Sequence, residues 1–150
     1  MRRDLPMILI RMAIGLVFLT EGILKFKHPA EFGPGRFTAI GFPIPEVLAP
    51  LVGGIEIAAG IAVLLNFFAG DAALLLLSIM VVALVSTKMP ILLGAPLGPF
   101  ALAKLPRYGW SSFLHEARLD LAMTLNLIAV LIDSGMRIGR RRPWYQSKGL

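Results

Sequence analysis

The chain has 150 residues, of which 57% are hydrophobic, and a formal net charge of +6 at pH 7. Its mean hydropathy of +0.77 exceeds that expected of a soluble domain, in which about 45 to 50% of residues are apolar. This composition excludes an ordinary soluble protein and favours an all-α membrane protein. The absence of cysteine excludes disulfides and any thiol chemistry carried by this chain itself.

Four apolar segments approach the roughly 20 residues that a helix needs to cross a bilayer. They cover about residues 5–24, 47–65, 72–89 and 113–132. We therefore expect one transmembrane domain, a bundle of four transmembrane helices that runs up and down. The amino end resembles a signal peptide, but Arg11 interrupts its apolar run and no small-residue cleavage pattern follows. We therefore interpret it as an uncleaved first span.

Two long connections, residues 25–46 and 90–112, are rich in the Gly and Pro that break helices, whereas residues 66–71 form a tight turn. With four spans, both long loops face one side of the membrane and both termini face the other. The densest basic cluster, Arg140 to Arg142, lies just beyond the last span. We therefore expect a protein of the cell (plasma or inner) membrane whose two termini both lie in the cytoplasm. Anionic lipid explains this cluster, and no nucleic-acid partner is expected.

One face of the first span alternates polar and small residues. At about 100° per residue, a single line along the helix collects Arg11, Gly15, Phe18, Gly22 and Lys25. One face of the second span likewise collects Gly53, Glu56, Gly60 and Leu64. Small residues let membrane helices approach closely, so we expect the two faces to meet. The helix-packing positions are Gly15, Gly22, Gly53 and Gly60.

Ionisable side chains within spans are candidates for a ligand or proton site, because a charge at the bilayer centre costs about 2.5 to 3.5 kcal/mol on insertion scales. The candidates are Arg11, Glu21, Lys25, Glu56, His115 and Asp120. Glu56, near the midplane, is the strongest of them. Its alternative role is a structural ion pair, for which Arg11 is the most plausible partner. For Glu21 and Lys25, a structural pair one helical turn apart is an equally good interpretation.

The predicted depth of the fourth span brings His115, Glu116 and Asp120 to the level of Glu21 and Lys25. Two histidines with scattered acids make a weak metal signature, so no metal site is expected. Aromatic residues border the loops: Phe32, Phe37, Phe42, Tyr108 and Trp110. They indicate interfacial anchors, and the alternative is a mouth through which a lipid-soluble ring enters.

The stretches "RMAIGLVFLTEGILKFKHPAEF", "GFPIP" and "LVGGIEIAAGIAVLLN" together resemble the DoxX family of small four-helix membrane proteins. The resemblance covers residues 9 to about 85, while the closing "DSGMRIGRR" lacks the family's trailing acid. The family includes a membrane subunit of a thiosulfate:quinone oxidoreductase and membrane components linked to redox or oxidative-stress complexes. The resemblance therefore implies an association with quinone.

Three functions are consistent with these residues. The leading hypothesis is a subunit of a redox complex that binds a quinone-like ring between the first, second and fourth spans. In it Glu56 is the proton-linked acid, and Arg11, Lys25 or His115 donates a hydrogen bond to a quinone oxygen. The alternatives are a non-enzymatic scaffold that recruits a partner protein, and a small-solute or proton transporter that works as a homo-oligomer. Because the sequence has no cysteine, no flavin motif and only a weak metal signature, we do not expect it to catalyse oxidoreduction alone.

Overall fold

A computed structural model describes residues 5–140, and the side chains of residues 5–135. The helices are α1 (Leu5–Lys27), α2 (Pro34–Ile40), α3 (Pro45–Leu64), α4 (Ala69–Ala83), α5 (Met89–Leu93) and α6 (Trp110–Arg140), and a π-turn (Leu84–Lys88) joins α4 to α5. The prediction of an all-α fold is confirmed. The side chains of the basic cluster at Arg140 to Arg142, on which the predicted orientation depends, lie outside the described residues.

Three helices of the described chain are long and apolar enough to cross a membrane: α1, α3 and the continuous helix Ala69–Leu93. Each has about the length that a hydrocarbon core of roughly 30 Å requires. The fourth predicted span falls within α6, which is not one of these three. Charged residues, Glu116, Arg118 and Asp120, occupy the amino-terminal part of α6. The membrane location is therefore established by three helices, and the fourth span stays a prediction.

The third predicted span does not end at Met89, because the helix continues through the π-turn to Leu93. A proline within a helix lacks an N–H donor, and its ring clashes with the carbonyl group four residues earlier. Pro90 stands at this position, and the preceding Met89 N–H donates to the carbonyl oxygen of Leu84, five residues back. The wider π-turn accommodates the proline where the sequence predicts a helix end.

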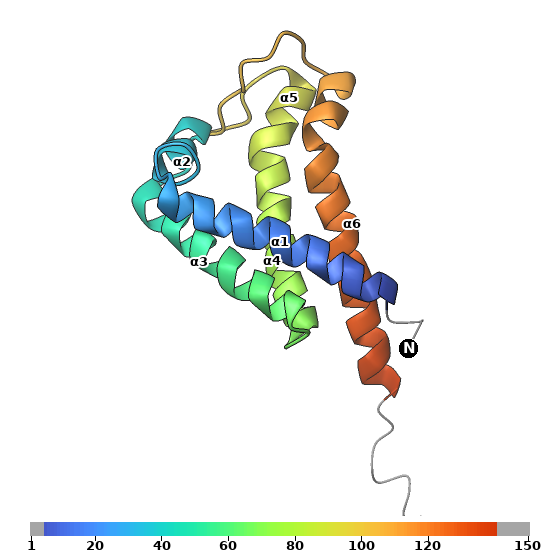
Figure 1. Cartoon of the computed structure of the whole chain (residues 1–150). Coiled ribbons are helices and arrows are strands. Elements are labelled where there is room, and N and C mark those ends of the chain that lie inside the picture. Colours follow the sequence, from blue (N-terminus) through green and yellow to red (C-terminus); the bar gives the residue numbers. More distant parts are fainter. Residues whose placement is uncertain (1–4, 141–150) are drawn as a thin grey trace, which may run out of the picture.

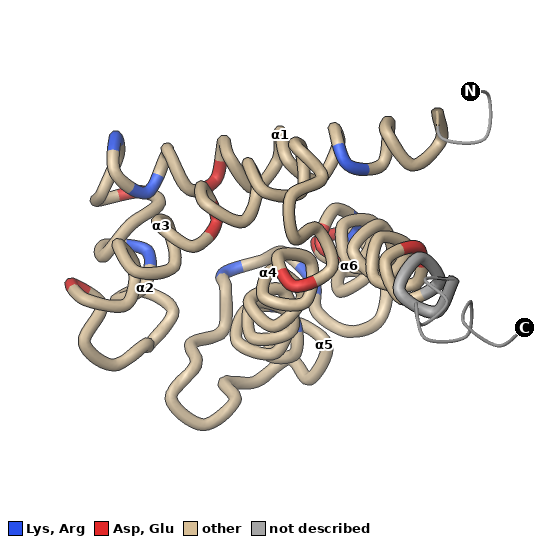
Figure 2. Tube along the Cα trace, turned by 90° about the horizontal axis from the view of Figure 1, so that it is seen from below, with Lys and Arg blue, Asp and Glu red and all other residues tan. Residues whose placement is uncertain are grey.

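The helices form two pairs that cross each other, α1 with α3 and α4 with α6. Figure 1 shows α1 and α3 side by side, with α1 running across α4 and α6. In the perpendicular view of Figure 2, α1 is seen along its length while α4 and α6 are seen nearly end-on. The structure therefore departs from the simple up-and-down bundle, in which neighbouring helices are antiparallel and all four lie nearly along one axis.

A short turn and a shared core hold the two pairs together at one end. The turn between α3 and α4 covers residues 65–68, so α4 begins at Ala69 and not at Ala72. The core beside it draws side chains from four helices: Ile14, Phe18, Ala59, Val63, Ala73, Leu76, Leu127 and Val130. Away from this turn, the crossing pairs diverge.

The two long connections meet at the other end of the molecule. The Ala101 N–H donates to the carbonyl oxygen of Ile40 over 2.8 Å, and the rings of Phe42 and Phe100 lie 5.2 Å apart. Gly41, which ends α2, has φ +104°, and a side chain there would collide with the carbonyl of Pro99. The connection between α5 and α6 therefore reaches across the divergent ends of the helices (Figure 1).

Candidate functional site

A cleft of about 520 Å³ lies where the two helix pairs diverge. One wall comes from α1, α2 and α3, and the other from α4, the π-turn and α6. The charged lining residues are Glu21, Lys25, Arg36, Glu56, Lys88, Glu116 and Asp120, and the aromatic ones are Phe18, Phe32, Phe37 and Phe42. A concave site of roughly 300 to 1,000 Å³ with an apolar lining and a few polar groups is typical of a small-molecule pocket.

The first wall is built around a buried ion pair. Lys25 Nζ lies 2.6 Å from Glu56 Oε2, and their side chains are 9% and 6% exposed. The same Nζ lies 3.8 Å from Glu21 Oε2, one helical turn earlier. A charge in the interior is tolerated when it is paired and hydrogen-bonded, and Lys25 satisfies Glu56 in this way. The ammonium group therefore connects two carboxylates along the wall.

Glycines bring the backbones that carry this ion pair close together. A methyl group on Gly22 would lie 2.7 Å from the carbonyl oxygen of Gly53, and one on Gly60 would lie 3.4 Å from that of Gly15. This pairing runs forward on α1 and backward on α3, so the helices are antiparallel. Side chains tilt toward the amino end of their helix. Lys25 and Glu56 therefore lean toward each other.

The predicted alternative that pairs Glu56 with Arg11 is wrong. Arg11 Nη2 lies 3.2 Å from Asp133 Oδ2 on α6. In an antiparallel pair, the tilt of the side chains carries Glu56 away from Arg11. Arg11 is 8% exposed and does not line the cleft. It links α1 to α6 outside the cleft.

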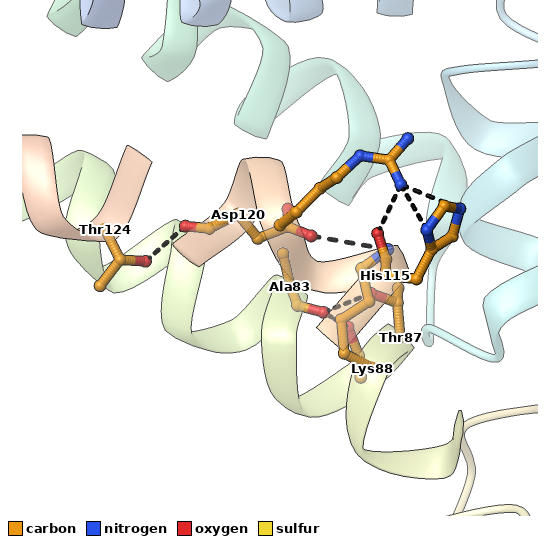
Figure 3. Close-up of polar contacts among 8 residues, drawn as sticks. Ala83, Thr87, Lys88, His115, Asp120 and Thr124 are labelled. Atoms are coloured by element: carbon orange, nitrogen blue, oxygen red, sulfur yellow. Dashed lines mark hydrogen bonds and ion pairs between the residues drawn. The ribbon is translucent and has the colours of Figure 1, made fainter. Parts of the chain in front are cut away.

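The second wall carries another lysine and carboxylate. Lys88 Nζ, at the end of the π-turn, lies 3.5 Å from Asp120 Oδ2 on α6, as Figure 3 shows. The hydroxyl of Thr87 donates to the carbonyl oxygen of Ala83 over 2.6 Å, and that of Ser86 donates to the same oxygen over 3.3 Å. Side chains of the π-turn therefore bond to the helix backbone and help to position Lys88 at the cleft.

His115 does not join this group. It is exposed, and Arg118 Nη1 donates to its backbone carbonyl oxygen over 2.9 Å. Of the residues that the sequence predicts for the site, the cleft collects Glu21, Lys25, Glu56 and Asp120, and Arg11 and His115 lie outside it. Among the bordering aromatic residues, the cleft is lined by Phe32, Phe37 and Phe42 but not by Tyr108 or Trp110.

Two lining residues, Arg36 and Lys88, are not among the site residues that the sequence predicts. Lys88 stands immediately before Met-Pro, and that proline was the available signal for a distorted helical turn. Nothing in the sequence around Arg36 distinguishes it from a solvated charge. Its place in the cleft follows from the short helix α2, which lies beside the ends of α1 and α3 (Figure 1) and packs against α3.

Comparison with known proteins gives two matches. The family model described as DoxX matches residues 7–89, more than half of the chain. A protein of Mycobacterium tuberculosis, described as an uncharacterized membrane protein, is 44% identical over 124 residues, which cover 83% of this chain and 72% of the relative. No solved structure matches significantly. The residues in the family match include Lys25, Glu56 and Lys88, whereas Asp120 lies beyond them.

Proposed function

The chain belongs to the DoxX family of integral membrane proteins, and we propose that it is the subunit of a membrane redox complex that binds a quinone-like ring. The observation that carries the proposal is the buried Lys25–Glu56 pair in the wall of an aromatic cleft of about 520 Å³. A ligand that reaches this cleft within a bilayer has to be lipid-soluble. A quinone combines an apolar ring with polar oxygens, as the cleft combines apolar and charged side chains.

The chemistry of a lysine–carboxylate pair fits both forms of such a ring. The ammonium group of Lys25 offers N–H donors to a carbonyl oxygen, and the carboxylate of Glu56 accepts a hydrogen bond from a ring hydroxyl. Reduction of a quinone takes up two electrons and two protons. In this proposal Glu56, with Glu21 beside it, holds and passes protons, while a partner subunit supplies the electrons. The chain itself has no cysteine that would carry them as a thiol.

We place the protein in the cell (plasma or inner) membrane, with α6 as a fourth span and both termini in the cytoplasm. The contact between the two long connections supports this arrangement, because loops on one side of a membrane can touch. The arginines beside the ends of the chain support cytoplasmic termini. In this orientation the cleft lies in the outer half of the membrane.

The test is to purify the protein in mild detergent from its own membranes. Bound quinones are then extracted from the purified protein with organic solvent and quantified by mass spectrometry. Glu56→Gln removes the carboxylate, and Val52→Trp fills the cleft while Lys25 and Glu56 are both kept. The controls are Glu31→Gln, at an exposed position outside the cleft, and Val47→Trp, at a side chain that is 60% exposed on the same helix.

The proposal predicts near-stoichiometric quinone in the wild type and both controls, and at least a fivefold loss in both cleft variants at equal yield. Quinone at the detergent background in the wild type would contradict it. The non-enzymatic scaffold would then become the better account, and a protein partner in the same eluate would be its first evidence.

A further inference from the structure

The cleft has a second polar wall that the proposed function does not use. Lys88 Nζ and Asp120 Oδ2 lie 3.5 Å apart there, and their side chains are 15% and 25% exposed. Both residues line the same cleft as Lys25 and Glu56. The two lysine–carboxylate pairs belong to different helix pairs, since α1 and α3 carry one while the π-turn and α6 carry the other.

The π-turn gives Lys88 its place. In a π-turn one extra residue enters the helical ladder, and such turns often occur at functional sites. Here the Met89 N–H donates to Leu84, and both neighbouring hydroxyls bond to the carbonyl oxygen of Ala83. Ser86 is 1% exposed, so this end of the turn is packed in place. Lys88 therefore extends from a supported backbone toward Asp120 (Figure 3).

Apolar side chains complete the lining around these two pairs, among them Phe18, Leu75, Ile79 and Met123. Each lysine–carboxylate pair can donate to an oxygen atom and accept from a hydroxyl. A ring with a single oxygen would bind to one pair and leave the other pair facing an apolar surface with only its internal contact. A site whose remaining donors and acceptors are left unmet discriminates against a ligand that lacks the matching group.

We propose that Lys88 and Asp120 bind the second oxygen of the ring, so that the cleft selects aromatic ligands with two opposed ring oxygens. This inference rests on the proposed function, because it assumes that a ring enters the cleft. It adds the identity of the ligand class, a para-quinone or its quinol, and it makes Lys88 a specificity-determining residue.

The experiment measures binding of two probes to the full chain in lipid nanodiscs. The probes are a decyl-substituted para-hydroquinone and the matching decylphenol, which differ in one ring hydroxyl. Lys88→Met and Asp120→Asn change the second wall, and Lys104→Met is the control at an exposed lysine outside the cleft. The readout is the ratio of the two dissociation constants in each sample, which does not depend on the fraction of folded protein.

We expect the wild type and Lys104→Met to bind the hydroquinone about tenfold more tightly than the phenol, since a hydrogen bond to a charged group contributes roughly that factor. In Lys88→Met the ratio should fall to within about twofold of one. Equal binding of both probes by the wild type, or an unchanged ratio in Lys88→Met, would contradict the proposal that the second wall binds a ring oxygen. Neither result would contradict the proposed function. Failure of the wild type to bind either probe would refute both.

Discussion

Lys25 of α1 and Glu56 of α3 form an ion pair across the most extensively packed interface among the described helices, with Nζ 2.6 Å from Oε2. Both side chains are almost fully buried. Glycines at the same interface set the separation of the backbones. The interface that holds the two helices together therefore also presents charge to the cleft.

Removing one member of this pair should destabilise the protein strongly, because the other charge is then left in the interior. We expect Lys25→Met to lower the free energy of unfolding by about 3 to 5 kcal/mol, measured by thermal or denaturant unfolding in detergent. The double variant Lys25→Met with Glu56→Leu should recover most of the loss. Lys27→Met is the control, since Lys27 is exposed two residues along the same helix. A single variant as stable as this control would contradict the role of the pair.

A side chain at Gly22 should force α1 and α3 apart. Its Cβ would lie 2.7 Å from the carbonyl oxygen of Gly53, a backbone atom that cannot turn aside. We expect Gly22→Ala to cost about 1 to 3 kcal/mol of stability. Gly54→Ala is the matched control, because a Cβ there meets nothing within 4 Å. Equal melting temperatures for the two variants would show that the backbones do not approach as described.

The Arg11–Asp133 contact should contribute less than the Lys25–Glu56 pair. The side chain of Asp133 is 22% exposed, whereas that of Glu56 is 6% exposed, and a carboxylate with access to a polar environment loses less when its partner is removed. We expect Arg11→Met to destabilise the protein by less than Lys25→Met under identical conditions. The reverse order would mean that the link between α1 and α6 is the principal electrostatic contact of the fold.

Much of the interface could be predicted from the sequence, because helical periodicity places side chains on faces without knowledge of the fold. The glycine positions on the first two spans are an example. The partner of Glu56 could not be predicted in this way. Depth counted from span ends placed Lys25 at the boundary and Glu56 at the midplane, and only the antiparallel crossing of the helices, with the tilt of the side chains, brings them together.

The place of Lys88 in the second wall of the cleft could not be predicted, for a different reason. A proline within an apolar segment indicates the end of a helix, so the third span was predicted to end at Met89, with Lys88 at its boundary. In the structure the π-turn absorbs Pro90 and the helix continues to Leu93. Whether a chain breaks or bulges at a proline depends on packing around it, here the contacts of the π-turn and α5 with α6. The sequence pattern does not contain those contacts.

The predicted orientation can be tested by labelling cysteines, since the chain has none of its own and each single-cysteine variant therefore has one site. Ser111→Cys lies at the start of α6 at an exposed position, and Ser147→Cys follows the arginine cluster. We expect a membrane-impermeant maleimide to label the first in intact cells and the second only after permeabilisation. Labelling of both positions from one side would contradict α6 as a fourth span.

The most direct test of the central claim is photolabelling with a quinone that carries an azide on its ring, in native membrane vesicles, followed by peptide mapping. The account predicts saturable labelling on peptides that contain Lys25, Phe42, Val52 and Lys88, which surround the cleft, and its loss when unlabelled quinone is added in excess. Labelling that does not compete with quinone, spread over exposed apolar side chains such as Leu16 and Leu125, which are 57% and 68% exposed, would contradict a quinone site in this protein.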